Sequence, residues 1–230
     1  MKHINIAIDG PGGAGKSTIS KEIARRLGII YVDTGALYRT VGYYAREHGL
    51  SVDDTKVSEL ITPMLENINI EIAYVDGTQH VILNGEDLGD KIRQPDISMY
   101  ASACSSVGTV RAFLLETQKK LARENSVIMD GRDIGTVILP NADVKIFLTA
   151  SNEARALRRY EELKLKGVDV KYEDVLRELN ERDAADSSRA VAPLKPADDA
   201  HLLDNSGFEF EDSVAYILNY IKEKTGVSEI

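Results

Sequence analysis

The stretch Gly10-Pro11-Gly12-Gly13-Ala14-Gly15-Lys16-Ser17 directly follows an apolar run at residues 3–9 and opens a helix-length amphipathic segment. It matches the pattern G-x-x-x-x-G-K-[ST], in which backbone N–H groups surround a bound phosphate. A loop that turns these groups inward needs positive φ, and glycine adopts positive φ most easily. The stretch therefore predicts a phosphate-binding loop (P-loop), with Lys16 on the β- and γ-phosphates of a nucleoside triphosphate and Ser17 on Mg²⁺.

Apolar β-branched runs alternate with helix-length amphipathic stretches along the chain, which is typical of parallel strands joined by crossover helices. Sheet strands are predicted at residues 3–9, 29–33, 126–130, 144–149 and 200–204. Helices are predicted at residues 16–27, 35–48, 107–123, 152–166, 172–189 and 211–224. The predicted fold class is α/β, with a central five-stranded parallel sheet flanked by helices.

The periodicity changes between residues 65 and 90, where apolar and polar residues alternate. Ile68, Ile70 and Ile72 precede a turn at Asp76-Gly77, and a second alternating run follows that turn. Two such runs joined by a glycine-containing turn predict an antiparallel hairpin, which a doubly wound sheet does not need. We therefore interpret residues 63–105 as an inserted subdomain, and residues 1–62 with 106–230 as the core P-loop domain.

The composition excludes several classes of protein. A chain of 230 residues with 43% hydrophobic residues can fold around a core, and its net charge of -9 argues against binding to a nucleic acid backbone. Cys104 is the only cysteine, which rules out an internal disulfide and a thiolate metal site and fits a reducing compartment. Because no apolar run approaches about 18 residues and no signal peptide is evident, we expect a soluble, cytoplasmic protein.

Arginines follow two of the predicted strands. Arg39 comes after the strand at 29–33 and Arg132 after the strand at 126–130. Ligands of open parallel sheets bind at the carboxyl ends of the strands, where both arginines and the P-loop are expected. Arginine is well suited to phosphate because its guanidinium is planar, always charged and bidentate. The pattern favours phosphoryl transfer between two nucleotides, and the lack of an Asn-Lys-x-Asp motif argues against a GTPase.

Four segments together resemble the bacterial cytidylate kinases: residues 10–18 (GPGGAGKST), 32–39 (VDTGALYR), 130–137 (DGRDIGTV) and 189–194 (RAVAPL). The resemblance covers essentially the whole chain. It implies the P-loop kinase fold, with an NMP-binding subdomain at residues 63–105 that contains antiparallel strands, and a short helical lid at residues 152–170. It also implies transfer of the γ-phosphate of ATP to CMP or dCMP, with Mg²⁺ required.

The resemblance implies roles for individual residues on the donor side. The catalytic residues would be Lys16, Arg132 and Arg182. ATP would be bound by Arg158 of the lid and by the P-loop residues Gly10, Pro11, Gly12, Gly13, Ala14, Gly15, Lys16, Ser17 and Thr18. Mg²⁺ would be held by Ser17 and by Asp130, which ends an apolar strand but could equally cap the loop through backbone N–H groups.

The resemblance also implies a set of residues that bind CMP. They are Thr34, Arg39, Ser102, Arg111, Arg132, Asp133, Arg182, Asp186 and Arg189. In this set the phosphate would lie on Arg39, Arg132 and Arg182. The cytosine edge would face Ser102, Arg111, Asp133 and Arg189, and the sugar hydroxyls would face Asp186. A carboxylate and a hydroxyl suit the amino group of cytosine, whereas uracil has an acceptor at that position.

Other interpretations remain open on sequence alone. Arg39 and Arg132 could form surface ion pairs. Arg182, Asp186 and Arg189 could form an i, i+4 and i, i+3 network on one helix face, and Arg155, Arg158 and Arg159 a solvated face. The chain could be a shikimate-type or dephospho-coenzyme A kinase, or a nucleotide-binding switch without turnover. We expect small-molecule substrates, no nucleic acid, membrane or obligate protein partner, and a monomer.

Overall fold

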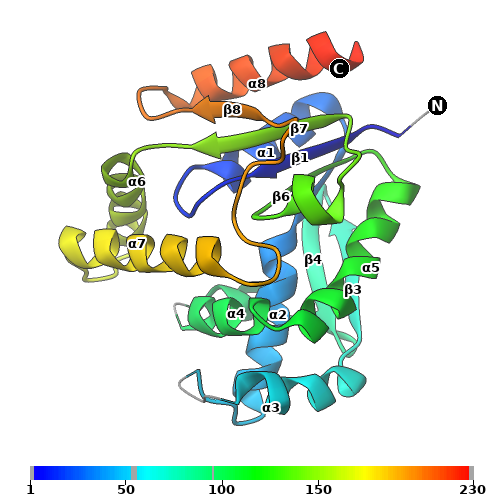
Figure 1. The fold of residues 1–230 in the computed structure, drawn as a ribbon, viewed down its shortest axis with the longest axis vertical. Helices are drawn as coiled ribbons and strands as arrows, with labels where there is room; N and C mark the ends of the chain where they lie inside the picture. Colours follow the sequence, from blue (N-terminus) through cyan, green and yellow to red (C-terminus); the bar gives the residue numbers. More distant parts are fainter. Residues whose placement is uncertain (1–2, 53–55, 95, 228–230) are drawn as a thin grey trace. The chain divides into compact units, whose positions relative to one another are not determined.

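The computed structural model describes residues 3–52, 56–94 and 96–227, which fall into two compact units (Figure 1). The first unit contains the residues up to Tyr31 and those from Asn125 onward, and the second unit is Val32–Glu124. The second unit therefore extends beyond residues 63–105 at both ends. The assignment of residues 63–105 as an NMP-binding subdomain stays a prediction.

The first unit is built on a five-stranded sheet with the strand order β2-β6-β1-β7-β8. Its strands are β1 (Asn5–Asp9), β2 (Ile30–Asp33), β6 (Val127–Gly131), β7 (Val144–Thr149) and β8 (His201–Asp204). The central strand β1 pairs in parallel with β6 and β7, and β7 pairs in parallel with β8. The predicted strands and the five-stranded parallel sheet are confirmed.

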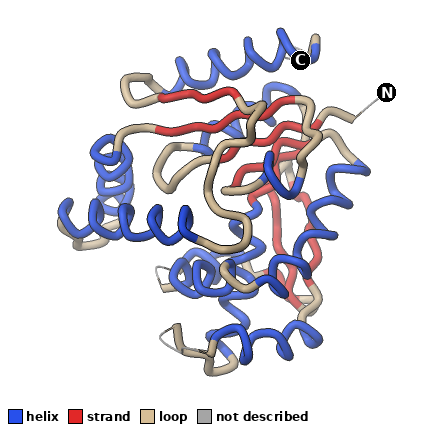
Figure 2. Tube along the Cα trace, in the orientation of Figure 1, coloured by secondary structure: helices blue, strands red, loops and turns tan. Residues whose placement is uncertain are grey.

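Four α-helices and one π-helical turn complete the first unit: α1 (Lys16–Leu27), α6 (Asn152–Leu165), α7 (Tyr172–Ser188), α8 (Phe210–Thr225) and η3 (Ile134–Ile138). Ile6 and Ile8 of β1 share a hydrophobic core with Ile23 of α1 and Ile217 of α8. Figures 1 and 2 show α8 running alongside β8. Because side chains alternate along a strand, Asp9 points to the face opposite that core.

The second unit contains an antiparallel sheet of three strands: β3 (Ile70–Val75), β4 (Thr78–Leu83) and β5 (Glu86–Asp87). Asp76 and Gly77, with φ of 50° and 73°, join β3 to β4. Asn84 and Gly85, with φ of 51° and 87°, join β4 to β5. Positive φ at both central residues is the requirement of a type I′ turn, so the predicted hairpin is confirmed with the turn that its sequence favours.

The helices of the second unit are α2 (Thr34–Glu47), α3 (Val57–Met64), α4 (Ile97–Ser105), α5 (Gly108–Glu124) and the 3₁₀ turns η1 (Leu65–Asn67) and η2 (Gly89–Arg93). Helices α2 and α4 touch so closely that a Cβ on Gly42 would lie 2.8 Å from the backbone nitrogen of Ala101. The sequence predicted α2 and α5 but not α3 or α4. Such short helices depend on tertiary packing more than on their own propensity.

The first glycine of the P-loop is required by packing as well as by conformation. Gly10 has φ of 148°, and a Cβ there would lie 1.9 Å from the carbonyl oxygen of Leu148 in β7. We expect Gly10→Ala to lower the free energy of unfolding by at least ~3 kcal/mol, because positive φ and overpacking both destabilise. Gly49→Ala is the control, since Gly49 has φ of 80° but open space around it. That variant should lose only about 1 kcal/mol in urea unfolding. Equal losses in the two variants would contradict the packing argument.

Candidate active site

The P-loop connects β1 to α1, and three of its glycines have positive φ. The angles are 148° at Gly10, 74° at Gly13 and 86° at Gly15. Gly12 does not have positive φ, but a Cβ there would lie 3.2 Å from the Leu179 side chain of α7. The loop conformation therefore favours glycine at positions 10, 13 and 15, and position 12 is tightly packed against α7.

The Lys16 side chain is buried at the start of α1, and its Nζ donates to the carbonyl oxygen of Pro11 at 2.7 Å. Burial lowers the pKa of Lys16 well below its usual value of 10.5, and the charges of Arg132 and Arg182 lower it further. Asp130 and Asp9 partly oppose this shift. The charges of Arg132 and Arg182 thus act on Lys16 at the P-loop. An anion bound there would favour the charged form of Lys16.

Asp130 meets the start of α1 because of the strand register. It pairs with Ile8 of β1 and so lies on the sheet face that α1 covers. One carboxylate oxygen accepts the hydroxyl of Ser17 at 2.7 Å, and the other accepts the hydroxyl of Tyr31 at 2.7 Å. Ser17 and Asp130 are therefore brought together as predicted for a hard-cation site, while Tyr31 is a partner that the sequence did not indicate.

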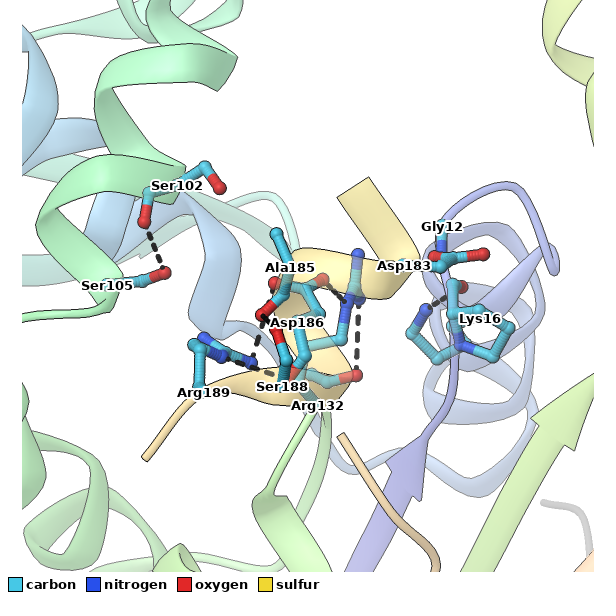
Figure 3. Close-up of polar contacts among 12 residues, drawn as sticks. Gly12, Lys16, Ser102, Ser105, Arg132, Asp183, Ala185, Asp186, Ser188 and Arg189 are labelled. Carbon is cyan, nitrogen blue, oxygen red and sulfur yellow. Dashed lines mark hydrogen bonds and ion pairs between the residues drawn. The ribbon is translucent and has the colours of Figure 1, made fainter. Parts of the chain in front are cut away.

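Arg132 and Arg189 share the carboxylate of Asp186, which is buried at the end of α7 (Figure 3). Arg132 Nε donates to Asp186 Oδ2 at 2.8 Å, and Arg189 Nη2 lies 3.5 Å from Asp186 Oδ1. Burial alone would raise the pKa of Asp186, but the charges of Arg132 and Arg189 outweigh it and hold that pKa below its usual value. The structure thus brings these three predicted residues together, and Arg182 lies on the same helix with its side chain exposed.

The segment that carries Arg132 and Asp133 is attached to the end of β1 by Asp9. The Asp9 carboxylate accepts the backbone N–H groups of Ile134 and Gly135, each at 2.7 Å. Asp9 and Asp133 are each only 3% exposed. Burial raises the pKa of Asp9 to about 6, and the nearby charge of Asp133 adds to the rise against the opposing effect of the two N–H groups and Lys16. The sequence prediction missed Asp9, although a carboxylate that ends a buried strand was a visible signal.

Helix α6 lies in the predicted lid, an assignment that stays a prediction, and its Arg155 binds the P-loop directly. Arg155 is 3% exposed, and its Nη1 donates to the carbonyl oxygen of Gly12 at 2.8 Å. Arg158 donates to the side chain and the carbonyl of Asn205 at 3.1 and 2.8 Å. The Arg159 side chain is 40% exposed and pairs with Glu162. The solvated-face interpretation therefore holds for Arg159 and not for Arg155, and ATP binding by Arg158 stays a prediction.

The remaining candidate residues, Thr34, Arg39, Ser102 and Arg111, belong to the second unit. Arg39 Nη2 donates to Asp33 Oδ2 at 2.7 Å, while its buried Nε has no hydrogen-bond partner among the residues described. Arg111 is buried over the ring of Tyr38 at 5.4 Å, and its Nη1 donates to a backbone carbonyl at 3.1 Å. Thr34 is buried at the start of α2, and Ser102 is half-buried in α4. The predicted role of these four residues in binding CMP is not tested by the structure. The same is true of the CMP-binding roles predicted for Arg132, Asp133, Arg182, Asp186 and Arg189.

A family model described as cytidylate kinase matches residues 6–223. The chain belongs to the cytidylate kinase family. A cytidylate kinase of Caldicellulosiruptor bescii is 51% identical over 218 residues, which cover 95% of each chain. A cytidylate kinase of Ligilactobacillus salivarius is 44% identical over 224 residues, covering 97% of this chain and 99% of the relative. The predicted resemblance is confirmed, and the shikimate-type kinase and the non-catalytic switch are not favoured.

A likeness to a solved structure adds to the fold assignment only. The crystal structure of an uncharacterized protein from Eubacterium ventriosum aligns with a TM-score of 0.52 at 13% identity, covering 96% of this chain and 99% of that one. Within residues 3–52, 56–94 and 96–227, no helix is long and apolar enough to cross a membrane. Neither observation bears on which residues of this cytidylate kinase family member bind its substrates.

The raised pKa of Asp9 predicts how stability changes with pH. Between about pH 4 and pH 6 the folded chain holds a proton on Asp9 that the unfolded chain has released, so the folded state binds more protons. Stability from this group is therefore present at low pH and lost as pH rises through that window, by up to about 3 kcal/mol. Urea unfolding of the wild type and of Asp9→Asn at several pH values measures this loss. The difference in free energy of unfolding between the two proteins should change between about pH 4 and pH 6 and be constant above pH 7. A difference that does not change with pH would contradict the raised pKa of Asp9.

Proposed function

We propose that the chain transfers the γ-phosphate of ATP to CMP or dCMP, giving ADP and CDP or dCDP. The observation that carries the proposal is a P-loop in a member of the cytidylate kinase family with two cations beside it: Lys16 is buried at the start of α1, and Arg132 Nη2 lies 3.8 Å from the position of a Cβ on Gly12. The charges of Arg132 and Arg182 also lower the pKa of Lys16. Such concentrated positive charge suits two phosphorylated reactants. It also suits a transition state whose charge spreads over the transferring group's oxygens.

The donor phosphates would lie in the P-loop. The backbone N–H groups of residues 10–18 and the positive end of α1 would bind the oxygens, and Lys16 would exchange its contact with the Pro11 carbonyl for the β- and γ-phosphates. The resemblance adds Arg158 on α6. These roles are supported by the loop geometry and by family membership.

Mg²⁺ would bind at Ser17 and Asp130. Their oxygens are hard donors held 2.7 Å apart at the P-loop, and this pair fits a cation that takes its other ligands from phosphate and water. Among the described residues, no group of three or more His, Cys, Asp or Glu side chains could hold a metal by itself. When bound, Mg²⁺ would neutralise charge on the donor phosphates.

The resemblance assigns the acceptor-binding roles residue by residue. Arg39, Arg132 and Arg182 would bind the CMP phosphate, and the buried Nε of Arg39 is a donor that such a phosphate would satisfy. Ser102, Arg111, Asp133 and Arg189 would face cytosine, and Asp186 would face the sugar hydroxyls. Its carboxylate would then both orient Arg132 and accept from the sugar.

The reaction needs no protein nucleophile. An oxygen of the CMP phosphate attacks the γ-phosphorus of ATP, the new P–O bond forms, and the bond to the β-phosphate bridging oxygen breaks to release ADP. The arginines and Lys16 hold the two phosphates in line and stabilise the charge that develops on the transferring oxygens. We also propose, from the sequence, that the enzyme acts in the cytoplasm as a monomer without an obligate partner.

A coupled ADP-release assay with CMP, dCMP, UMP, AMP, GMP and shikimate tests the function. CMP and dCMP should support rapid turnover, and UMP should have a kcat/KM at least about tenfold lower, because it would leave buried partners of the amino group unpaired. Turnover with shikimate and with none of the nucleotides would refute the proposed function. Equal kcat/KM for CMP and UMP would contradict the cytosine-reading roles and leave the kinase activity standing.

Lys16→Ala tests the donor site. We expect the variant to fold and to retain less than about a tenth of the wild-type kcat, since about 1.4 kcal/mol of barrier corresponds to one decade of rate. Lys21→Ala is a matched control on the same helix, with an exposed side chain 5.6 Å over the Tyr31 ring. It should keep near-normal turnover, and a comparable loss in both variants would contradict a specific role for Lys16.

A further inference from the structure

The backbone N–H and carbonyl groups of Gly12 bind side chains from two helices, α7 and α6. The N–H of Gly12 donates to Asp183 Oδ1 of α7 at 3.2 Å, and its carbonyl accepts from Arg155 Nη1 of α6 at 2.8 Å. The same Arg155 nitrogen donates to Asp183 Oδ2, so the two side chains also bind each other. Figure 3 shows Asp183 beside Gly12 and Lys16. We call Arg155 and Asp183 the Gly12 clamp.

Arg155 is fully engaged within the protein. Besides Gly12 and Asp183, its Nε donates to the Ala150 carbonyl at 3.0 Å and its Nη2 donates to Asn152 Oδ1. The side chain is 4% exposed, and that of Asp183 is 17% exposed. An arginine with its donors used in this way is a structural element of the loop's surroundings, unlike Arg159 of the same helix, whose side chain is 40% exposed.

Two further contacts show that α6 forms part of the wall of the P-loop. A Cβ on Gly13 would lie 3.0 Å from the carbonyl oxygen of Arg155 and 3.1 Å from its Cβ, so helix and loop backbones are in direct contact. Asn205, which receives Arg158, donates its Nδ2 to the carbonyl of Ala14 at 3.3 Å. Arg155 and Asp183 therefore bind a loop whose backbone is already packed against α6.

We propose that Arg155 and Asp183 are positioning residues of the donor site, which hold the backbone of Gly12 so that the P-loop keeps its nucleotide-binding conformation. A glycine-rich loop loses much conformational freedom when it closes around phosphates. The N–H and the carbonyl of Gly12 belong to two successive peptide units. Fixing both units removes part of that loss before the nucleotide arrives, and this preorganisation strengthens binding. The proposal rests on the donor role of the P-loop stated above.

The test is a double-mutant cycle on ADP binding, measured by calorimetry without CMP. Arg155→Met, Asp183→Ala and the double variant should each bind ADP about tenfold more weakly, with much less than additive losses, because the two residues act as one unit. CMP affinity should change little. Asp183→Asn keeps an acceptor for the Gly12 N–H and should recover part of the ADP affinity.

Arg177 and Asp174 provide a matched control pair. They form an Arg–Asp ion pair of 2.6 Å on α7, and their side chains are 60% and 44% exposed. Arg177→Met and Asp174→Ala should leave ADP affinity unchanged.

Unchanged ADP affinity in folded variants of Arg155 and Asp183 would overturn the proposal. So would losses of ADP affinity that add up in the double variant. A third contrary outcome is an equal loss of affinity for ADP and for CMP that accompanies a lower melting temperature. If Arg155→Met does not fold, Asp183→Ala and Asp183→Asn decide by the same criteria. Wild-type protein that fails to bind ADP would refute the proposed donor site instead.

Discussion

The carboxylate of Asp9 joins two segments that are far apart in the chain, at the end of the strand that leads into the P-loop. Its two oxygens accept the N–H groups of Ile134 and Gly135, and the packing at Gly135 is tight, because a Cβ would lie 3.3 Å from Asp9 Oδ2 and 3.2 Å from the Lys145 side chain. The donor loop and the Arg132–Asp133 segment are thereby fixed to the same strand end. Asp9 is charged at neutral pH in spite of burial, and it destabilises the fold to that extent.

Carboxylates inside the first unit hold its arginines in place. Asp186 orients Arg132 and Arg189, and Asp183 orients Arg155. A chain with a net charge of -9 can in this way keep a local concentration of positive charge at one loop. The pair with Asp183 also helps to satisfy the buried guanidinium of Arg155, which would otherwise be costly in a low-dielectric interior. The acidic side chains are thus part of the anion site, although none of them would contact the transferring phosphate.

The two ends of helix α6 differ in how they are attached. At the start of α6, Arg155 binds the P-loop directly, and Arg158 binds Asn205, which donates to the Ala14 carbonyl of the loop. Farther along, Arg159 pairs with Glu162 of its own helix, and Leu165 is 90% exposed. Helix α6 is therefore joined to the P-loop at its N-terminal end and exposed to solvent at its C-terminal end.

The sequence by itself determined the fold class and the chemistry. Period-two and period-3.6 patterns are local properties of the chain, so the strands and long helices could be predicted from them. The hairpin turn at Asp76-Gly77 and the P-loop could be predicted from their glycines and short motifs. Short α3 and α4 could not be predicted, because their stability comes from packing. The motifs at residues 10–18, 32–39, 130–137 and 189–194 indicated the family.

Only the tertiary structure decided how the arginines and carboxylates are paired. Arg155 had the sequence context of a solvated lid residue, yet it is buried against Gly12, which lies far from it in the chain. Asp9, Tyr31 and Asp183 had no motif of their own, and their partners are set by strand register and helix packing. A charged side chain is compatible with many partners, and the fold selects one by bringing distant segments within hydrogen-bond distance.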